Sequence, residues 1–407
     1  MPPELSQREA QLIRAVARRG PAMLEDLRRW VAIPTGMNHT PGLDELRGIV
    51  TSRLEALGAR TTLVPGEPAP DWLYGGPSAD EPVPPTAVCA RLRDSCASRV
   101  LLASHLDTVF APDDPFAQLS VAPDGATATG PGCVDMKGGI VVAVHALEAL
   151  EEVGIDCSWS YLLNSDEERG SHHSAAALAA QAKQHDVGLA TEPALAQGEL
   201  AIARKGSGQF RIDAHGRAAH VGRAFSEGVS AVYALARAIV EVERLAAGPP
   251  AHTVSVGPLV GGEAINIVPE RACCWGNARY DDAEEEALIA RALDALATDE
   301  EALPRVVVRR CFSRPPKPAT PATLALAELA RAQAEALGQA LPFARTGGVC
   351  DGNNLQAAGL PTIDTLGVRG GGLHTRSEWI ELASLVERAQ LLALLLAQLA
   401  EAPLTVA

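Results

Sequence analysis

The stretch from residue 99 to residue 164 contains RVLLASH (99–105), KGGIVVAVHALEALEE (137–152) and SWSYLLN (158–164). The first and last segments are short apolar runs of the kind that form buried strands, and the middle segment is a strongly apolar helix. Strands that alternate with helices are typical of a sheet whose two faces are both covered by helices. The stretch therefore predicts an α/β fold.

Toward the N-terminus, apolar residues at helical spacing predict a helix over residues 6–31 and another over residues 42–57, ended by Gly58. A strand is expected at TAVCARL, residues 86–92. Between these elements, residues 65–85 are rich in Pro, Gly and Asp and predict a long surface loop.

The pattern changes in the middle of the chain, where strands and helices follow in the order β-α-β-β-α-β. We expect strands at residues 209–216, 252–260, 271–280 and 304–312, with helices at 226–247 and 283–297. This order is that of a ferredoxin-like unit. Further along, helix–strand alternation resumes, with helices expected at 325–337 and 381–400 and a strand at 360–368.

These patterns predict a discontinuous α/β domain interrupted by an inserted domain. The α/β domain would comprise residues 1–205 and 315–407. The ferredoxin-like α+β insert, which we call the lid, would comprise residues 206–314. A chain of 407 residues is long enough for two such compact units.

Composition excludes several classes of partner. The formal net charge of −15 is unfavourable for binding nucleic acid, whose phosphates require a basic surface. The N-terminal residues show no apolar signal core, and no stretch reaches the roughly 18 uninterrupted apolar residues of a membrane span. The eight cysteines form no CxxC pair. We expect a cytoplasmic protein that binds neither nucleic acid nor membrane.

Ionisable residues recur where the predicted strands end or in the loops that follow. They are His105, Asp107, Asp135, Glu167, Glu168, Glu192 and His374. Each alone has an ordinary explanation, such as a helix cap or a solvated loop. Together they are more informative, because ligands bind at the carboxyl ends of strands in open α/β sheets.

The residue types at these positions suit a pair of metal ions. Two imidazoles and three or four carboxylates can hold two divalent ions about 3.5–4 Å apart, bridged by one carboxylate. The adjacent acids Glu167 and Glu168 can divide the work, one as a ligand and one as a general base. Asp107 lies two residues after His105 and is a candidate to orient its imidazole.

In this order, from about residue 99 to residue 380, the segments resemble the zinc metallopeptidases and amidohydrolases that include glutamate carboxypeptidase, acetylornithine deacetylase, succinyl-diaminopimelate desuccinylase and aminoacylase. The resemblance implies a di-zinc exopeptidase-like α/β domain with a ferredoxin-like lid that often dimerises. It assigns the ligands as follows: His105 and Glu192 to one zinc, Glu168 and His374 to the other, and Asp135 as the bridge. It makes Glu167 the general base and Asp107 the residue that orients His105. It also implies a cis peptide bond between Asp135 and Met136.

The resemblance extends to residues that would contact substrate. In GRAAHVGRAFSEGVSA, His220 matches a histidine that reaches the partner subunit's active site, where it would stabilise the oxyanion. Further candidates for substrate binding are Asn266, Arg279, Arg314, Gly347 and Gly348. Arg279 is expected to hold a substrate carboxylate, because its planar guanidinium binds carboxylates in a bidentate manner. We expect a structural role for Lys205.

We therefore predict a homodimeric, metal-dependent hydrolase that cleaves the amide bond of an N-acyl amino acid or a C-terminal residue. Two Zn²⁺ ions are expected, with Co²⁺ or Mn²⁺ as alternatives. Relatives that need a free amino terminus tend to have Asp where this chain has Glu192, so a dipeptidase or aminopeptidase is less favoured. A deacetylase-like or desuccinylase-like deacylase remains an alternative. A non-catalytic binding protein is disfavoured because every expected ligand is present. The acyl group, the amino acid and the role of residues 65–85 are left open.

Overall fold

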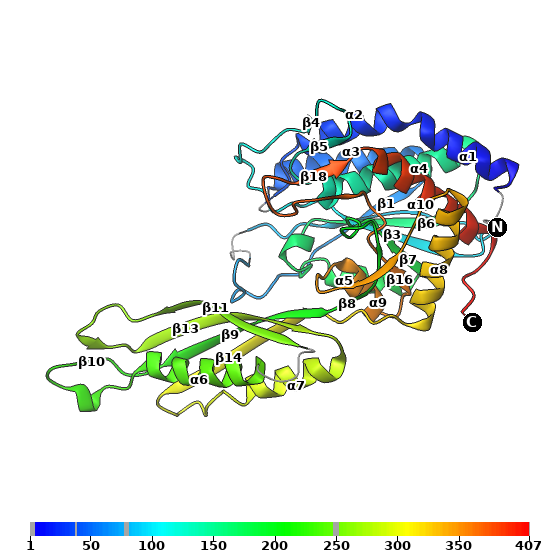
Figure 1. The fold of residues 1–407 in the computed structure, drawn as a ribbon. Coiled ribbons are helices and arrows are strands. Elements are labelled where there is room, and N and C mark those ends of the chain that lie inside the picture. Colours follow the sequence, from blue (N-terminus) through cyan, green and yellow to red (C-terminus); the bar gives the residue numbers. More distant parts are fainter. Residues whose placement is uncertain (1–4, 37–38, 77–80, 247–251, 407) are drawn as a thin grey trace.

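The computed structural model describes residues 5–36, 39–76, 81–246 and 252–406. It consists of an α/β domain, which contains both ends of the chain, and an elongated lid that projects from it (Figure 1). The lid sheet begins at Gly206 and ends at Arg314, the residues at which we predict the domain boundaries. Residues 77–80 of the predicted loop and residue 247 of a predicted helix lie outside the described residues.

The centre of the α/β domain is a six-stranded sheet whose middle strands are parallel. Its order is β1 (Arg60–Val64), β2 (Thr86–Arg91), β6 (Ser158–Asn164), β3 (Arg99–His105), β7 (Val187–Ala190) and β16 (Thr362–Ile363). Strands β6, β3, β7 and β16 run parallel, whereas β1 and β2 are antiparallel to their neighbours. The carboxyl ends of the parallel strands therefore meet at one edge.

Helices cover both faces of this sheet, as the apolar patterns predict (Figure 1). The helices of the domain are α1 (Gln7–Arg18), α2 (Gly20–Val31), α3 (Thr40–Ala56), α4 (Gly138–Val153), α5 (Ala175–Ala182), α8 (Pro321–Ala336), α9 (Asp351–Ala357) and α10 (Ala383–Glu401). Helix α10 packs against α1, α4 and α8. It is the one described helix long and apolar enough to cross a membrane, and 67% of its most apolar window is buried within the protein. Its apolar length therefore fits a core helix.

Two smaller sheets bring distant parts of the chain together. One has the order β17 (Gly370–Gly371), β18 (Trp379–Glu381), β5 (Thr127–Thr129) and β4 (Ser120–Val121). The other pairs β8 (Leu200–Arg204) with β15 (Phe343–Thr346). Because β18 pairs with β5, the loop that contains His374 lies beside the turn that contains Asp135. These sheets were not predicted, since their strands are too short to show periodicity.

The lid is the ferredoxin-like unit expected from the sequence. Its four-stranded antiparallel sheet has the order β11 (Thr253–Gly261), β13 (Arg271–Tyr280), β9 (Gly206–His215) and β14 (Arg305–Arg314). Helices α6 (Ala231–Ala246) and α7 (Ala283–Asp294) pack on it over a separate apolar core. The short strands β10 (Ala219–His220) and β12 (Ile267–Val268) pair at the far end of the lid (Figure 1).

Two predictions for secondary structure are wrong. The single helix over residues 6–31 is two helices, and the second begins with Gly20 and Pro21. Proline has no amide proton for a helix interior but is tolerated in a first turn, so it marks a helix start. The strand predicted over residues 360–368 is reduced to Thr362–Ile363.

The described part of loop 65–85 crosses from the α/β domain to the lid. The indole Nε1 of Trp275 donates to the carbonyl oxygen of Trp72 at 2.7 Å, and the rings of Tyr74 and Trp275 lie 5.6 Å apart. The amide N–H of Tyr74 donates to the side chain of Gln209 at 3.1 Å. The loop therefore connects the two domains on the inner face of the lid.

Candidate metal centre

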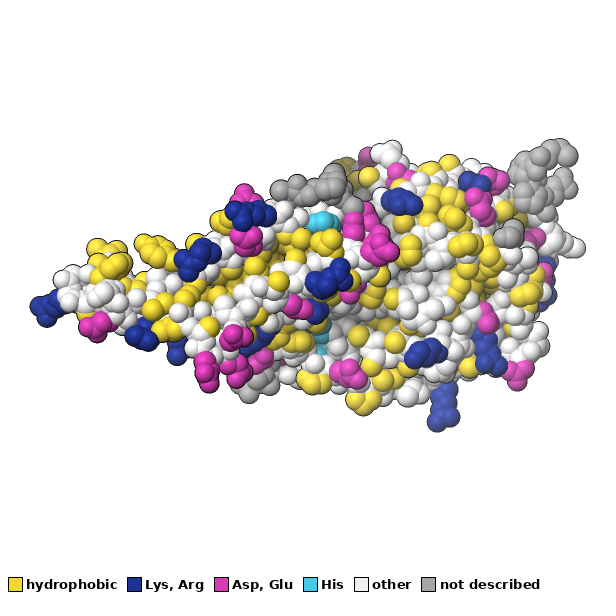
Figure 2. Space-filling model, turned by 90° about the horizontal axis from the view of Figure 1, so that it is seen from below, with side chains coloured by type: hydrophobic (Ala, Val, Ile, Leu, Met, Phe, Trp, Pro, Cys, Tyr) yellow, Lys and Arg dark blue, Asp and Glu magenta, His cyan; other side chains and the backbone are white. Residues whose placement is uncertain are grey.

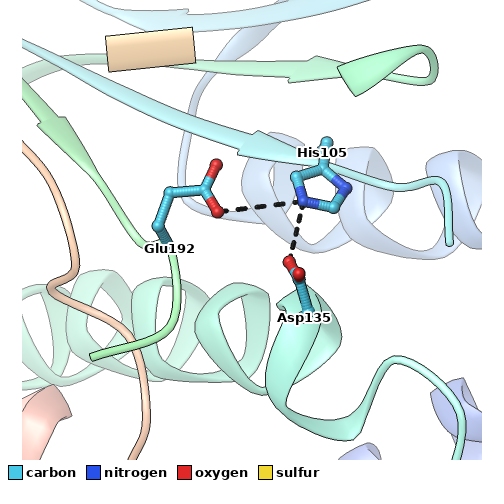
Figure 3. Close-up of side chains that lie close together, drawn as sticks. All are labelled: His105, Asp135 and Glu192. Carbon is cyan, nitrogen blue, oxygen red and sulfur yellow. Dashed lines mark hydrogen bonds and ion pairs between the residues drawn. The ribbon is translucent and has the colours of Figure 1, made fainter. Parts of the chain in front are cut away.

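Three buried side chains form the first half of the site, which we call the buried triad. His105 is the last residue of β3, Glu192 follows the neighbouring parallel strand β7, and Asp135 lies in the turn before α4 (Figure 3). The imidazole Nε2 of His105 lies 3.1 Å from Oδ1 of Asp135 and 4.0 Å from Oε2 of Glu192. Three possible ligand atoms thus face one point.

The second half, which we call the open triad, consists of Asp135, Glu168 and His374. Glu168 lies in a 3₁₀ turn (Glu167–Arg169) just beyond β6, and His374 lies in the loop between β17 and β18. The imidazole Nε2 of His374 is 3.1 Å from Oε2 of Glu168 and 3.5 Å from Oδ2 of Asp135. The side chain of His374 is 54% exposed, so this half is accessible to solvent.

Asp135 contributes a different oxygen to each triad. Its Oδ1 faces His105 and its Oδ2 faces His374. Within each triad, the possible ligand atoms lie within 4.8 Å of one another. Imidazole nitrogens and carboxylate oxygens are ligands that Zn²⁺ accepts, so the donor set fits two divalent ions that share Asp135. The peptide bond between Asp135 and Met136 is cis, which confirms that prediction.

Asp107 contacts both halves of the site, His105 through its backbone carbonyl oxygen and the Glu167–Arg169 turn through its carboxylate. The Nδ1 atom of His105 lies 2.9 Å from the backbone carbonyl oxygen of Asp107, and 3.5 Å from its carboxylate. A hydrogen bond to the carbonyl fixes the tautomer that leaves Nε2 free for a ligand bond. The carboxylate of Asp107 accepts the backbone N–H groups of Glu167 and Glu168 at 3.2 and 2.9 Å. It therefore positions the 3₁₀ turn Glu167–Arg169.

The site concentrates negative charge in a desolvated place. Burial raises the pKa of Glu192 well above its ordinary value and also raises the pKa of Glu168. Burial alone would lower the pKa of His105, but the surrounding carboxylates raise it well above normal. Hydrogen bonds to Asp135 and Glu168 raise the pKa of His374 to about 10. A bound cation would balance the charge of these carboxylates, and metal binding in such sites displaces protons.

Glu167 directly precedes Glu168 in the 3₁₀ turn and is paired with Arg314. Burial raises the pKa of Glu167 to about 8, although the charge of Arg314 opposes this rise. Arg314, at the end of lid strand β14, donates to Oε1 of Glu167 at 2.7 Å and to Asp351 at 2.8 Å. Its guanidinium is buried against protein carboxylates. Substrate binding by Arg314 stays a prediction, and in this structure its contacts position the expected base.

Arg279 is a partly buried residue of lid strand β13. Its guanidinium contacts the side chain of Asn277 at 3.0 Å and the carbonyl oxygen of Gly347 at 3.5 Å. Among the residues that the structure describes, no carboxylate lies within 4.0 Å of it. The adjacent carbonyl oxygen of Gly348 accepts from Arg204 at 3.1 Å, so a buried cation supports this turn. Arg279 and residues 347–348 thus form one partly exposed corner at the base of the lid.

His220 and Asn266 lie far from this corner. His220 ends β10 and Asn266 directly precedes β12. These two strands pair at the far end of the lid, where the N–H of Val221 donates to the carbonyl oxygen of Asn266 at 3.0 Å (Figure 1). Both side chains are exposed. The structure of one chain therefore does not bring these two predicted residues to the metal centre. Lys205 pairs with Asp281 at 2.9 Å, a contact between side chains that fits the structural role we expected.

Two buried acids near the site were not predicted from the sequence. The carboxylate of Asp351 contacts Arg314, Ser171 and Asn164. Glu378 accepts hydrogen bonds from the turn that contains Asp135. Both lie within segments that carry candidate residues, but nothing in their spacing separates them from solvated acids.

Comparison with known proteins agrees with this geometry. The sequence profile of peptidase family M20/M25/M40 matches residues 101–398. The chain is 27% identical to carboxypeptidase G2 from Pseudomonas sp., with 97% of this chain and 93% of that protein covered. It is 26% identical to succinyl-diaminopimelate desuccinylase 2 from Shewanella loihica, with 72% and 83% covered. The fold also matches the crystal structure of aminopeptidase PepT from Bacillus cereus, with a TM-score of 0.72, 21% identity, and 94% and 99% of the two chains covered.

Proposed function

Because the chain belongs to peptidase family M20/M25/M40 and is thus a hydrolase of peptide or amide bonds, we propose that it is a dinuclear zinc enzyme that releases a C-terminal amino acid or the amino acid of an N-acyl compound. The observation that carries the dinuclear part is the position of Asp135, whose two oxygens face separate triads. His105 and Glu192 would complete one site, and Glu168 and His374 the other. When bound, the ions would supply Lewis-acid activation of water and of the scissile carbonyl.

The chain's own residues would move the protons. Glu167, whose side chain is 11% exposed, is held by Arg314 through its carboxylate and by Asp107 through its backbone N–H. It would take a proton from the attacking water and deliver it to the leaving amine. A base with raised pKa suits this exchange, because it has to hold the proton between the two steps. Asp351 keeps Arg314 in place for the same purpose.

Arg279 would anchor the substrate's carboxylate at the base of the lid. A buried carboxylate partner already occupies Arg314, whereas Arg279 has none among the described residues. Its position beside Gly347 leaves its planar group facing the corner below the lid. Holding the carboxylate there would fix the distance to the scissile bond. The preference for an acylated or internal amine over a free amino terminus follows from Glu192 only by resemblance.

A panel of substrates tests this function. Metal-free protein would be loaded with Zn²⁺, Co²⁺ or Mn²⁺, its metal content measured, and hydrolysis followed for N-acyl amino acids, N-succinyl compounds and dipeptides. We expect two ions per chain and cleavage of substrates with a free α-carboxylate. The matched control is the same substrate amidated at its C-terminus, which should be cleaved poorly. Equal cleavage of the amide would contradict the anchor, and preferred cleavage of unblocked dipeptides would favour a dipeptidase.

We also propose that the active enzyme is a homodimer in which His220 acts at the partner's site. Hydrophobic side chains are exposed on the lid (Figure 2). Among the exposed residues are Tyr233 on α6 and Leu259 and Val260 on the edge strand β11. Exposed apolar groups and an unpaired edge strand are features that a second copy can cover. Because His220 lies at the far end of the lid, only another chain could place it beside a reacting carbonyl without a large movement of the lid.

Complementation tests the shared site. We would prepare a heterodimer, isolated by two different tags, of one Glu167→Gln chain and one His220→Ala chain. Each variant homodimer should be weakly active, but the heterodimer has one intact site and should regain about half of the wild-type activity. A heterodimer no more active than its parents, or a fully active His220→Ala homodimer, would remove His220 from the partner's site.

A further inference from the structure

Glu378 is a buried acid, 1% exposed, that is bonded to the turn around Asp135. Its Oε1 accepts the backbone N–H groups of Val134 at 2.9 Å and Asp135 at 3.1 Å, and its Oε2 accepts that of Gly132 at 3.0 Å. One carboxylate therefore holds three amides in the segment that presents the shared ligand. A carboxylate with several N–H partners is a strong, charge-assisted contact.

The same residue belongs to the loop that carries His374. The N–H of Glu378 donates to the carbonyl oxygen of Thr375 at 3.0 Å, which folds the loop back directly after the histidine. The carbonyl oxygen of Glu378 accepts from Gly130 at 3.1 Å. Glu378 is thus bonded through its backbone to the His374 loop and through its side chain to the Asp135 turn. It connects two of the three residues of the open triad.

The connection matters because it joins the two segments that present Asp135 and His374. Two segments more than 230 residues apart in sequence meet here through the short pairing of β18 with β5. His374 is largely exposed, and its backbone has a positive φ of 62°, which is uncommon for a residue other than glycine. A small shift of the Asp135 turn would change the direction of both carboxylate oxygens. The buried carboxylate of Glu378 opposes such a shift through its three hydrogen bonds to this turn.

We propose that Glu378 is a positioning residue that fixes the Asp135 carboxylate and the His374 loop relative to each other, and so sets the ligand geometry of the open triad. This inference rests on the proposed dinuclear function. Glu378 touches neither substrate nor reacting atoms and acts through Asp135 and His374. Outer residues of this kind typically change metal affinity or activity by about 10–100-fold when they are replaced.

The test compares Glu378→Gln with the control Glu381→Gln. Glutamine places an NH₂ group where a carboxylate oxygen accepts backbone N–H groups, so at least one buried amide loses its partner. Glu381 lies three residues later, on β18, and pairs with Arg369 at 2.8 Å without contact to the Asp135 turn. Metal-free proteins would be titrated with Co²⁺, and stoichiometry, affinity, the visible absorption of bound Co²⁺, kcat and KM would be measured.

For Glu378→Gln we expect weaker binding of the second Co²⁺ by about 10–100-fold, an altered Co²⁺ spectrum and a similar fall in kcat at saturating substrate. KM should change little, because Arg279 is untouched. Glu381→Gln should resemble the wild type. The charge-conserving variant Glu378→Asp should recover part of the affinity.

Each other outcome would overturn the inference. If Glu378→Gln matches Glu381→Gln in Co²⁺ affinity, spectrum and kcat while the wild type binds two ions, the role of Glu378 fails and the proposed function stands. If the wild type binds no Co²⁺, both fail. If Glu378→Gln and Glu378→Asp both fail to fold, as judged by circular dichroism, the residue is structural and does not act through ligand geometry.

Discussion

The buried triad and the open triad share Asp135 but are built from different parts of the fold. His105 and Glu192 end or follow adjacent parallel strands, and both side chains lie almost entirely inside the protein. Glu168 lies on a short 3₁₀ turn, and His374 lies on an exposed loop. The central sheet thus positions two residues of the buried triad, whereas a short turn and a loop position Glu168 and His374 of the open triad. This arrangement would let an ion in the buried triad stay fixed while substrate and solvent approach an ion in the open triad.

Glu167 belongs to neither triad, so its replacement should separate catalysis from metal binding. Glutamine keeps the shape and the hydrogen bond to Arg314 but cannot take a proton at Oε1. We expect Glu167→Gln to lower kcat by about 10²–10⁴-fold, the usual contribution of a general base, with both metal ions retained. The measurement is kcat together with metal content. Near-normal turnover would exclude Glu167 as the base, and loss of an ion would make it a ligand.

The two histidines should differ when each is removed. Because outer residues alone cost about 10–100-fold in affinity, His374→Ala should weaken one Co²⁺ by at least about 100-fold and leave the other bound. His105→Ala should weaken the buried site and also lower the free energy of unfolding of the metal-free protein by about 1–3 kcal/mol, since it leaves space in a packed core. Co²⁺ titration and urea unfolding would measure both effects. Equal loss of both ions in both variants would show that the halves are not independent.

The same division explains what the sequence could predict. The strands before His105, Glu167 and Glu192 are short, largely apolar runs of four to seven residues, so the positions of these residues at one sheet edge followed from the pattern. The lid was also predictable, because its strands and helices are long and periodic. The α/β fold and the family were therefore accessible from the sequence.

The open half was less accessible, since short strands and single contacts build it. Strands β5 and β18 have three residues each, too few to show alternation. The hydrogen bond from the N–H of Asp135 to the carboxylate of Glu378 joins residues more than 240 positions apart in the sequence, and no local pattern indicates such a contact. The pairing of Arg314 with Glu167 joins the lid to the 3₁₀ turn Glu167–Arg169 in the same way. These contacts depend on how separate elements pack against one another, and the periodicity of the sequence carries no information about that packing.

Asp107 provides a test of the link between the halves. Its carbonyl oxygen accepts from His105, while its carboxylate accepts from the backbone of Glu167 and Glu168. Asp107→Asn keeps the carbonyl but replaces one carboxylate oxygen by NH₂, so only the contacts to the turn should weaken. We expect the Co²⁺ affinity of the open triad to fall by about 10–100-fold, with the buried triad unchanged. A selective loss at the buried triad would instead show that the carboxylate mainly orients His105.

The smallest effect on stability and activity is expected for the contact between loop 65–85 and the 3₁₀ turn that contains Glu168. Arg169, the last residue of the 3₁₀ turn that contains Glu167 and Glu168, donates to the carbonyl oxygen of Gly75 at 2.6 Å and pairs with Glu81 at 3.0 Å. Both charged groups are partly exposed, so solvent screens the ion pair. Arg169→Ala should lower the free energy of unfolding by less than about 1 kcal/mol and change kcat little, as measured by urea unfolding and steady-state kinetics. Arg99→Ala, which removes an exposed pair with Asp94 away from the turn, is the control. If Arg169→Ala weakened Co²⁺ binding as strongly as His374→Ala, the loop would count as part of the metal centre, and the open half would be as firmly held as the buried one.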